Sequence, residues 1–171
     1  SMTSQANRSY FIDSVRYWVG HDTKIVVDND RTNEKECEDE QKAIDDIEKE
    51  LSVDIPRFLY RPEGLEFKDY NISKDFEYAL LQYDYNDTIM TLYINKYDKE
   101  TKSTGASLDG KEIETIKLPE GEASIQVKRI MAKGDKKASY VAYWNNSTEF
   151  YQIESQMEEK EFIKLIKNIK F

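Results

Sequence analysis

The sequence predicts an α+β domain in which a curved antiparallel sheet packs against a C-terminal helix, with further helices before the sheet. After Pro56, short segments rich in β-branched and aromatic residues follow one another, and several alternate between apolar and polar positions. Turn sequences separate these segments at short intervals. Helical spacing of apolar residues is confined to the region before Pro56 and to the C-terminal end. The chain therefore predicts a sheet flanked by helices.

The region before the sheet predicts a mixed segment, residues 1–54, that packs on a main domain formed by residues 55–171. Apolar residues have helical spacing between Asn7 and Val19, and the β-branched run Thr23–Val27 predicts a strand. From about Cys37 to Leu51, apolar residues again recur at helical intervals while acidic residues cover the other faces. This second helix is expected on the surface of the domain.

The sheet itself is predicted as an antiparallel meander, because the turn sequences between its segments are of the kind that joins neighbouring strands. On one strand the apolar positions change parity near Leu80, which predicts a bulge or bend there. The expected strands are Leu65–Ile72, Phe76–Tyr85, Thr88–Tyr97, Lys111–Leu118, Ala123–Ala132, Ala138–Trp144 and Thr148–Ser155.

The C-terminal helix is predicted by a capping box and one apolar stripe. Ser155 and Glu158 have the spacing of a side-chain cap at a helix start. The stripe that follows should pack on the sheet, and it consists of Phe162, Leu165, Ile166 and Ile169.

Composition limits the classes of partner. A chain of 171 residues with 39% hydrophobic content is long enough for one folded domain. The net charge of −9 repels phosphate backbones, so we expect no nucleic-acid partner. No apolar run is as long as a membrane span, and Ser1-Met2 is typical of a cloning remnant. A membrane anchor is therefore expected only in a native segment that precedes the given sequence.

No residue pattern predicts catalysis, a metal site or a cofactor. The single histidine, His21, has no nucleophile motif beside it, and acidic neighbours disfavour the thiolate of Cys37. The spacing of Asp28, Asp30 and Asn33 resembles the start of a calcium loop, but the segment lacks the central glycine and the remaining ligands of such a loop. We expect the protein not to be an enzyme.

Tyrosines gather on adjacent predicted strands and give two alternative interpretations. Exposed aromatic rings mark binding surfaces, so Tyr78, Tyr83, Tyr85 and Tyr93 are candidate partner-binding residues. Alternatively, these rings pack across strands and are buried, which is the more frequent arrangement.

Several short motifs after Pro56 resemble the bacterial domain of unknown function 4367 family, over residues 56–171. They are the run from Tyr60 to Leu65, the strand that ends at Tyr83 to Tyr85, Gly121-Glu122-Ala123, Trp144, Tyr151, and the closing helix from Phe162 to Ile166. The resemblance implies an extracytoplasmic domain at the cell surface of a Gram-positive bacterium, following a single transmembrane helix. Some members are coupled to anti-sigma-type regulators. No catalytic motif comes with the resemblance.

The function expected from these observations is noncatalytic binding or sensing, with an envelope protein as partner. The alternative is a carrier that holds a lipid-like or other small apolar ligand in a cavity between the sheet and the helix. An enzyme would need carboxylates from different strands that converge in a cleft. Trp144 is expected in the core, because Tyr140 and Ala142 lie on the same strand face.

Overall fold

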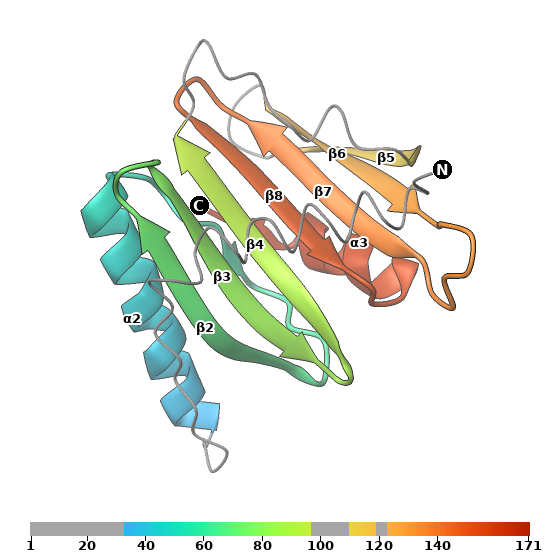
Figure 1. The fold of residues 1–171 in the computed structure, drawn as a ribbon, viewed down its shortest axis with the longest axis horizontal. Coiled ribbons are helices and arrows are strands. Elements are labelled where there is room, and N and C mark those ends of the chain that lie inside the picture. The colour runs from blue at the N-terminus through green and yellow to red at the C-terminus, as the bar shows by residue number, and fades with distance from the viewer. Residues whose placement is uncertain (1–32, 97–109, 119–122) are drawn as a thin grey trace.

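The computed structural model describes residues 33–96, 110–118 and 123–171, which form one large sheet, one small sheet and two helices (Figure 1). The helices are α2 (Asn33–Leu51) and α3 (Glu159–Lys167). The strands are β1 (Arg57–Phe58), β2 (Leu65–Ser73), β3 (Tyr78–Tyr85), β4 (Thr88–Lys96), β5 (Lys111–Lys117), β6 (Ser124–Ile130), β7 (Ser139–Asn145), β8 (Glu149–Ser155) and β9 (Ile169–Lys170). The predicted α+β class is confirmed. The helix and strand expected before residue 33 lie outside the described residues.

The large sheet has the order β2-β3-β4-β8-β7-β6-β5, and all its neighbours are antiparallel. It consists of two consecutive meanders, β2 to β4 and β5 to β8. They join where β4 pairs with β8, so β5 lies at the opposite edge from β2. The small sheet pairs β1 with β9 and brings both ends of the main domain together.

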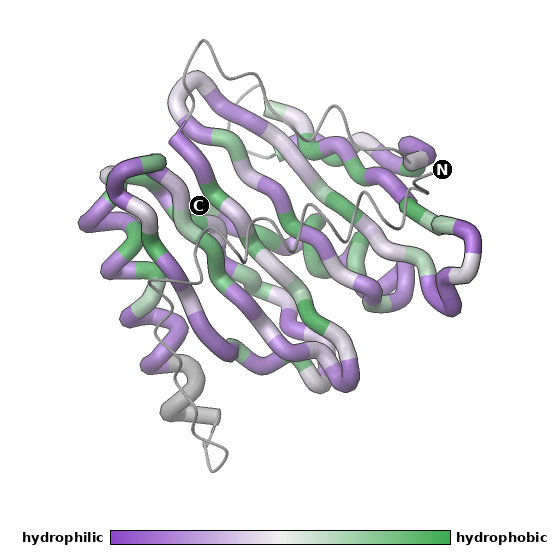
Figure 2. The backbone as a smooth tube through the Cα atoms, in the orientation of Figure 1, coloured by the Kyte–Doolittle hydropathy of each residue, from purple (hydrophilic) through white to green (hydrophobic). Residues whose placement is uncertain are grey.

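Both helices pack on the same face of the large sheet, because their apolar residues join one hydrophobic cluster with the sheet residues of that face. Ile47 of α2 and Phe162 of α3 are fully buried there, together with Leu81 and Ile153 of the sheet. Figure 2 shows apolar and polar residues alternating along the strands, as expected for strands whose two faces have different environments. The division at residue 54 stays a prediction, although α2 shares the core of the main domain.

The predicted bulge near Leu80 is wrong. β3 pairs with β4 without interruption, and the irregularity on its other side lies in β2, between Phe67 and Asp69. Residues of both parities are apolar because both faces of β3 are buried. Leu81 faces the main core, whereas Leu80 lies with Tyr78 in a small cluster on the opposite face.

The predicted capping box is also wrong. Ser155 is the last residue of β8, and α3 begins later, after Glu158, which makes no side-chain cap. The Ser155 hydroxyl instead accepts a hydrogen bond of 3.1 Å from the Met157 N–H. Acidic residues in the first turn of α3 and Lys164 and Lys167 in the last turn stabilise the helix through its dipole.

An ion pair holds the end of α2 against the start of the main domain. Arg57 lies 3.2 Å from the Glu48 carboxylate, which also accepts a 3.0 Å hydrogen bond from the Ile55 N–H. Burial opposes the charged form of Glu48, but these hydrogen bonds outweigh it, and its pKa is lowered from 4.5.

We expect acid to destabilise the domain partly through Glu48. Since its pKa is lower in the folded state than in the unfolded state, its stabilisation is present above pH 4.5 and is lost as the pH falls through the folded-state pKa. Urea unfolding of wild type and Glu48→Gln across this range measures the effect. The variant should lose less stability on acidification, and parallel pH profiles would contradict the assignment.

Candidate functional site

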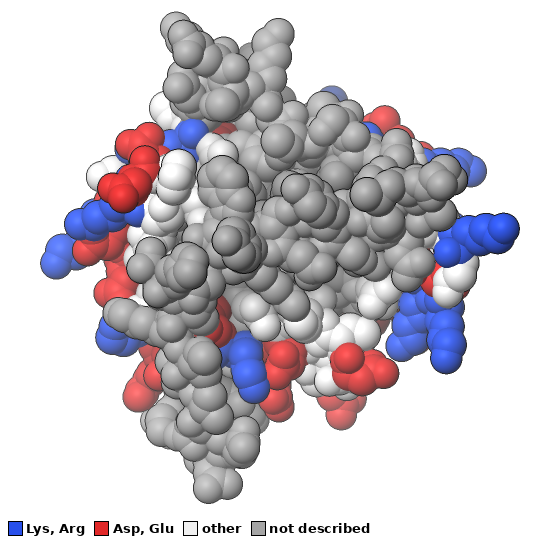
Figure 3. Space-filling view, viewed as in Figure 1, with Lys and Arg blue, Asp and Glu red and all other residues white. Residues whose placement is uncertain are grey.

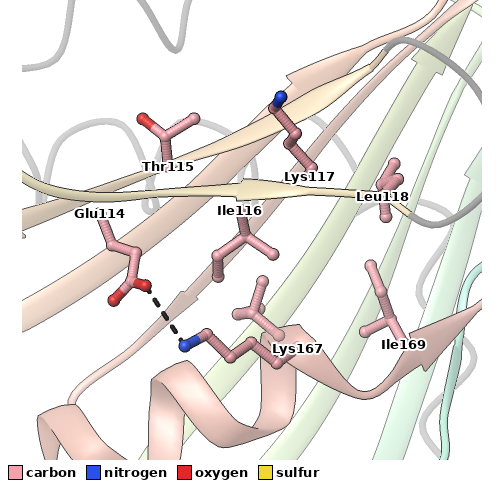
Figure 4. Close-up of a pocket in the computed structure, with 8 residues that line it drawn as sticks. Glu114, Thr115, Ile116, Lys117, Leu118, Lys167 and Ile169 are labelled. Atoms are coloured by element: carbon pink, nitrogen blue, oxygen red, sulfur yellow. Dashed lines mark ion pairs between the residues drawn. The ribbon is translucent and has the colours of Figure 1, made fainter.

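The structure has two adjoining hollows at the edge of the sheet where α3 ends. The first, here called the β5–α3 groove, has a volume of about 400 Å³ and lies between edge strand β5 and the helix. Figure 4 shows Ile116 directed from β5 toward the helix, while Thr115 and Lys117 point away. Glu114 and Lys167 form a 3.3 Å ion pair across the groove. Its walls are therefore apolar, with a balanced ion pair at one side.

The second hollow, here called the C-terminal pocket, has a volume of about 440 Å³. It shares Leu118, Lys167 and Ile169 with the β5–α3 groove, so the two hollows adjoin along these residues. The remaining residues that line it are Asp54, Leu59, Ala123, Trp144, Asn146, Asn168, Lys170 and Phe171.

The chain forms this pocket because α3 ends at Lys167 and the residues after it do not join the large sheet. Asn168 caps the helix, and its carbonyl accepts a 2.8 Å hydrogen bond from the Leu59 N–H. β9 then pairs with β1. The C-terminal residues consequently run beside the end of β7 without filling the space next to it.

Aromatic rings form one wall of the pocket. Trp144 stacks on Tyr151 with ring centroids 5.0 Å apart, and Phe171 meets both rings edge-on. The Tyr151 ring is held in place by its hydroxyl, which donates a 2.7 Å hydrogen bond to the Asp54 carbonyl. Trp144 is only 3% exposed, which confirms its predicted place in the core.

The polar atom of Trp144 is unsatisfied. Its indole Nε1 is buried and makes no hydrogen bond. An indole N–H can only donate, so this group requires an acceptor atom. Buried donors without partners are rare in folded proteins, and such a group beside a cavity suggests that a ligand supplies the missing acceptor.

Two large apolar residues are exposed at or beside this pocket. Leu59 is 67% exposed and Phe171 is 42% exposed. Both line the C-terminal pocket. Apolar side chains gathered at a hollow are typical of binding sites.

Charges are distributed unevenly over the surface. On the face seen in Figure 3, acidic and basic side chains alternate over α2, whereas basic side chains gather at the turn between β6 and β7. That turn contains Lys133, Lys136 and Lys137. The net charge of the chain therefore does not describe every part of its surface.

The tyrosine strands are more buried than a binding surface requires. Tyr78 is 5% exposed and Tyr83 is 1% exposed, which favours the packing alternative for both. Tyr83 donates a hydrogen bond to Glu40 of α2, and Arg61 donates to the same carboxylate. Burial and the nearby Glu40 charge raise the pKa of Tyr83 well above 10. This cluster joins α2 to the sheet and has no exposed ring.

Tyr85 and Tyr93 are partly exposed and stay candidate partner-binding residues. The Tyr93 ring packs between Tyr78 and Phe150, at centroid distances of 5.8 and 6.4 Å. Tyr85 lines a polar hollow with Arg129 and Glu158. The structure places these two tyrosines away from the C-terminal pocket, so they do not form one site with it.

Of the residues considered for metal binding or catalysis, His21, Asp28 and Asp30 lie outside the described residues, and so do the side chains of Asn33 and Cys37. In the rest of the chain, no group of three or more His, Cys, Asp or Glu side chains is placed to hold a metal ion. Nor does any helix in the described part have the length and apolar character of a membrane span.

Sequence reasoning did not find the C-terminal pocket. Leu59 precedes the Tyr60-to-Leu65 run and Phe171 follows the last helix, so neither belongs to a periodic pattern. The available signal was two large apolar residues, Leu59 and Phe171, outside any helical or alternating pattern.

Comparison with known proteins gives one match. A family model described as "Domain of unknown function (DUF4367)" matches residues 55–169, more than half of the chain. No curated protein and no solved structure matches.

Proposed function

The chain belongs to the domain of unknown function 4367 family, and we propose that it is a noncatalytic binding or sensing domain. Its place is outside the cytoplasm of a Gram-positive bacterium, on a protein anchored by an upstream transmembrane helix. The family resemblance supports this location, and we extend the proposal to an anti-sigma-type regulator as the anchored protein. In this proposal, the upstream transmembrane helix transmits the binding of a ligand from the domain to the cytoplasm.

The observation that carries the proposal is the C-terminal pocket, with exposed Leu59 and Phe171 at its opening and an unsatisfied indole donor in its wall. Ligand sites are concave and mostly apolar, with a few polar groups that orient the ligand. The pocket has this composition. It also lies beside the paired ends of the main domain, where a bound ligand would contact residues adjoining the preceding chain.

The chemistry of the pocket supports binding rather than catalysis. Asp54 is the one acidic side chain among its described lining residues, and no described histidine, serine or cysteine accompanies it. In the adjoining groove, Glu114 is paired with Lys167. Acid–base catalysis needs two groups with separated roles near the reacting atoms, and these residues do not supply such a pair.

A carrier of a lipid-like or other small apolar ligand is the second candidate. The adjacency of the C-terminal pocket and the β5–α3 groove favours it, since a ligand that spans both would contact the apolar residues Leu118 and Ile169, which line both hollows. A carrier would release its ligand to acceptor vesicles, whereas a sensing domain would retain it.

Photocrosslinking tests whether this pocket is the binding site. We expect a benzoylphenylalanine placed at Leu59 to capture a reproducible protein or lipid from native bacterial envelopes, identified by mass spectrometry. The same group at Phe76 is the matched control, because Phe76 is 64% exposed, similar to Leu59 at 67%, and does not line the pocket. Capture at both positions, or at neither, would contradict the proposed site.

A further inference from the structure

We propose that the C-terminal pocket binds an amphiphile with one hydrocarbon chain and an anionic head group, a carboxylate or a phosphate. The head group lies at Trp144 and Lys170, and the chain follows the β5–α3 groove. This inference rests on the proposed function and names the ligand class of the same site.

The shape of the space favours a linear chain. The two hollows have volumes of about 440 and 400 Å³ and meet at Leu118 and Ile169. Ile116 and Ile166 continue the apolar lining along α3. In this proposal a flexible hydrocarbon chain lies across both adjoining hollows, and burial of each methylene group against their apolar residues favours binding.

The indole of Trp144 selects the head group. Its buried Nε1–H has no acceptor, so the ligand atom placed there must be an oxygen that accepts a hydrogen bond. Phe171 lies edge-on to Trp144, at a centroid distance of 6.2 Å, and is itself partly exposed. Because Nε1 is buried, a neighbouring side chain has to move before a head group can reach it, and in this proposal the partly exposed Phe171 ring is the one that moves. A quaternary ammonium head could not satisfy this donor.

The charges at the pocket favour an anion. Among the described residues, each acidic side chain at the two hollows has a basic neighbour: Glu114 is paired with Lys167, and Asp54 acts on Arg57, whose pKa is raised mainly by its hydrogen bond with Glu48 and further by the charges of Asp45 and Asp54. Lys170 is exposed and lines the pocket, and no ion pair joins it to another described side chain. An anionic head group would provide its counter-charge.

An extended peptide added to edge strand β5 is the competing occupant, and the structure disfavours it. The register of β5 shifts between Glu112 and Glu114, and an irregularity of this kind hinders the pairing of a further strand with the edge of the sheet. Exposed Lys111, Glu112 and Lys117 also charge the strand.

The test uses the full chain and the indole signals of a ¹H–¹⁵N spectrum. There are two tryptophans, Trp18 and Trp144, and Trp144→Phe assigns their signals. We expect laurate, below its critical micelle concentration, to shift the Trp144 signal saturably. Dodecanol should bind at least about tenfold more weakly, because it lacks the charge that strengthens the hydrogen bond. Dodecyltrimethylammonium should leave the signal unchanged.

Two matched lysine variants test the head-group position. Lys170→Ala should weaken laurate binding about two- to fivefold, as expected for one exposed ion pair. Lys160→Ala is the control, since Lys160 is equally an exposed lysine but does not line the pocket. Equal affinities for the two variants would overturn the proposed role of Lys170.

The remaining outcomes separate the ligand class from the proposed function. Equal binding of laurate, dodecanol and the cationic amphiphile would overturn the anionic head group. Binding to phosphatidylglycerol vesicles but not to free laurate would support the same head-group chemistry with a membrane lipid as its source. If neither binds while Leu59 still captures a species from envelopes, the ligand class is wrong and the binding function stands.

Discussion

Glu40→Ala is expected to lower the free energy of unfolding by about 2–4 kcal/mol, the range for removing one partner from a buried, charged hydrogen-bond cluster. Glu40 lies on the buried face of α2 and accepts hydrogen bonds from Tyr83 and Arg61. Its removal leaves the fully buried Tyr83 hydroxyl without an acceptor. Because Arg61 is partly exposed, water can solvate its guanidinium, which limits the loss.

Urea denaturation checks this prediction, with Glu38→Ala as the matched control. Glu38 lies two residues earlier on the same helix and is exposed, so its removal should change stability by less than about 0.5 kcal/mol. Tyr83→Phe should cost about 1 kcal/mol, since Glu40 keeps Arg61 as its partner. If Glu40→Ala and Glu38→Ala were equally stable, the cluster would not stabilise the packing of α2.

Phe162→Ala is expected to destabilise the domain by about 3–5 kcal/mol, as for other large-to-small changes of buried aromatic residues. Phe162 is fully buried where α3 meets the sheet, and its ring lies 5.9 Å from that of Tyr140 on β7. Truncation would leave a cavity between the helix and the sheet and remove this ring contact.

Phe76→Ala provides the control for the same chemical change. Phe76 is mostly exposed, at the turn between β2 and β3, so its truncation should leave the denaturation midpoint nearly unchanged. A small loss for Phe162→Ala would mean that α3 is not packed on the sheet as the structure shows.

The sequence predicts those elements whose patterns are local. The helical spacing of apolar residues from Phe162 to Ile166 predicts α3, and the alternation of Ile125 and Val127 with polar residues predicts β6. Each pattern is contained within the element itself. Ile169 shows the limit of this reasoning. It continues the helical spacing but belongs to β9, since the helix ends at Lys167 and a distant strand, β1, supplies the pairing.

The strand order and the site depend on contacts between distant residues. Turn sequences show that β2 to β4 are neighbours, but nothing local indicates that β8 pairs with β4. The tyrosines are a similar case. The pattern shows that Tyr83 alternates with polar neighbours, but its burial depends on Glu40, which lies on a helix 43 residues earlier. The pocket likewise arises where three distant segments meet.

The pairing of β1 with β9 brings the two ends of the main domain side by side. Arg57 pairs with Lys170 at the outer end of this ribbon, and Phe58 pairs with Ile169 further in. A chain that enters at residue 55 therefore leaves beside its entry point, so a pulling force on both ends would act on this one small sheet. A force that pulls the two ends apart would break the Arg57–Lys170 pair first and the Phe58–Ile169 pair second. The C-terminal pocket adjoins the β1–β9 sheet, so a ligand bound there would lie next to the pairs that a pulling force breaks first.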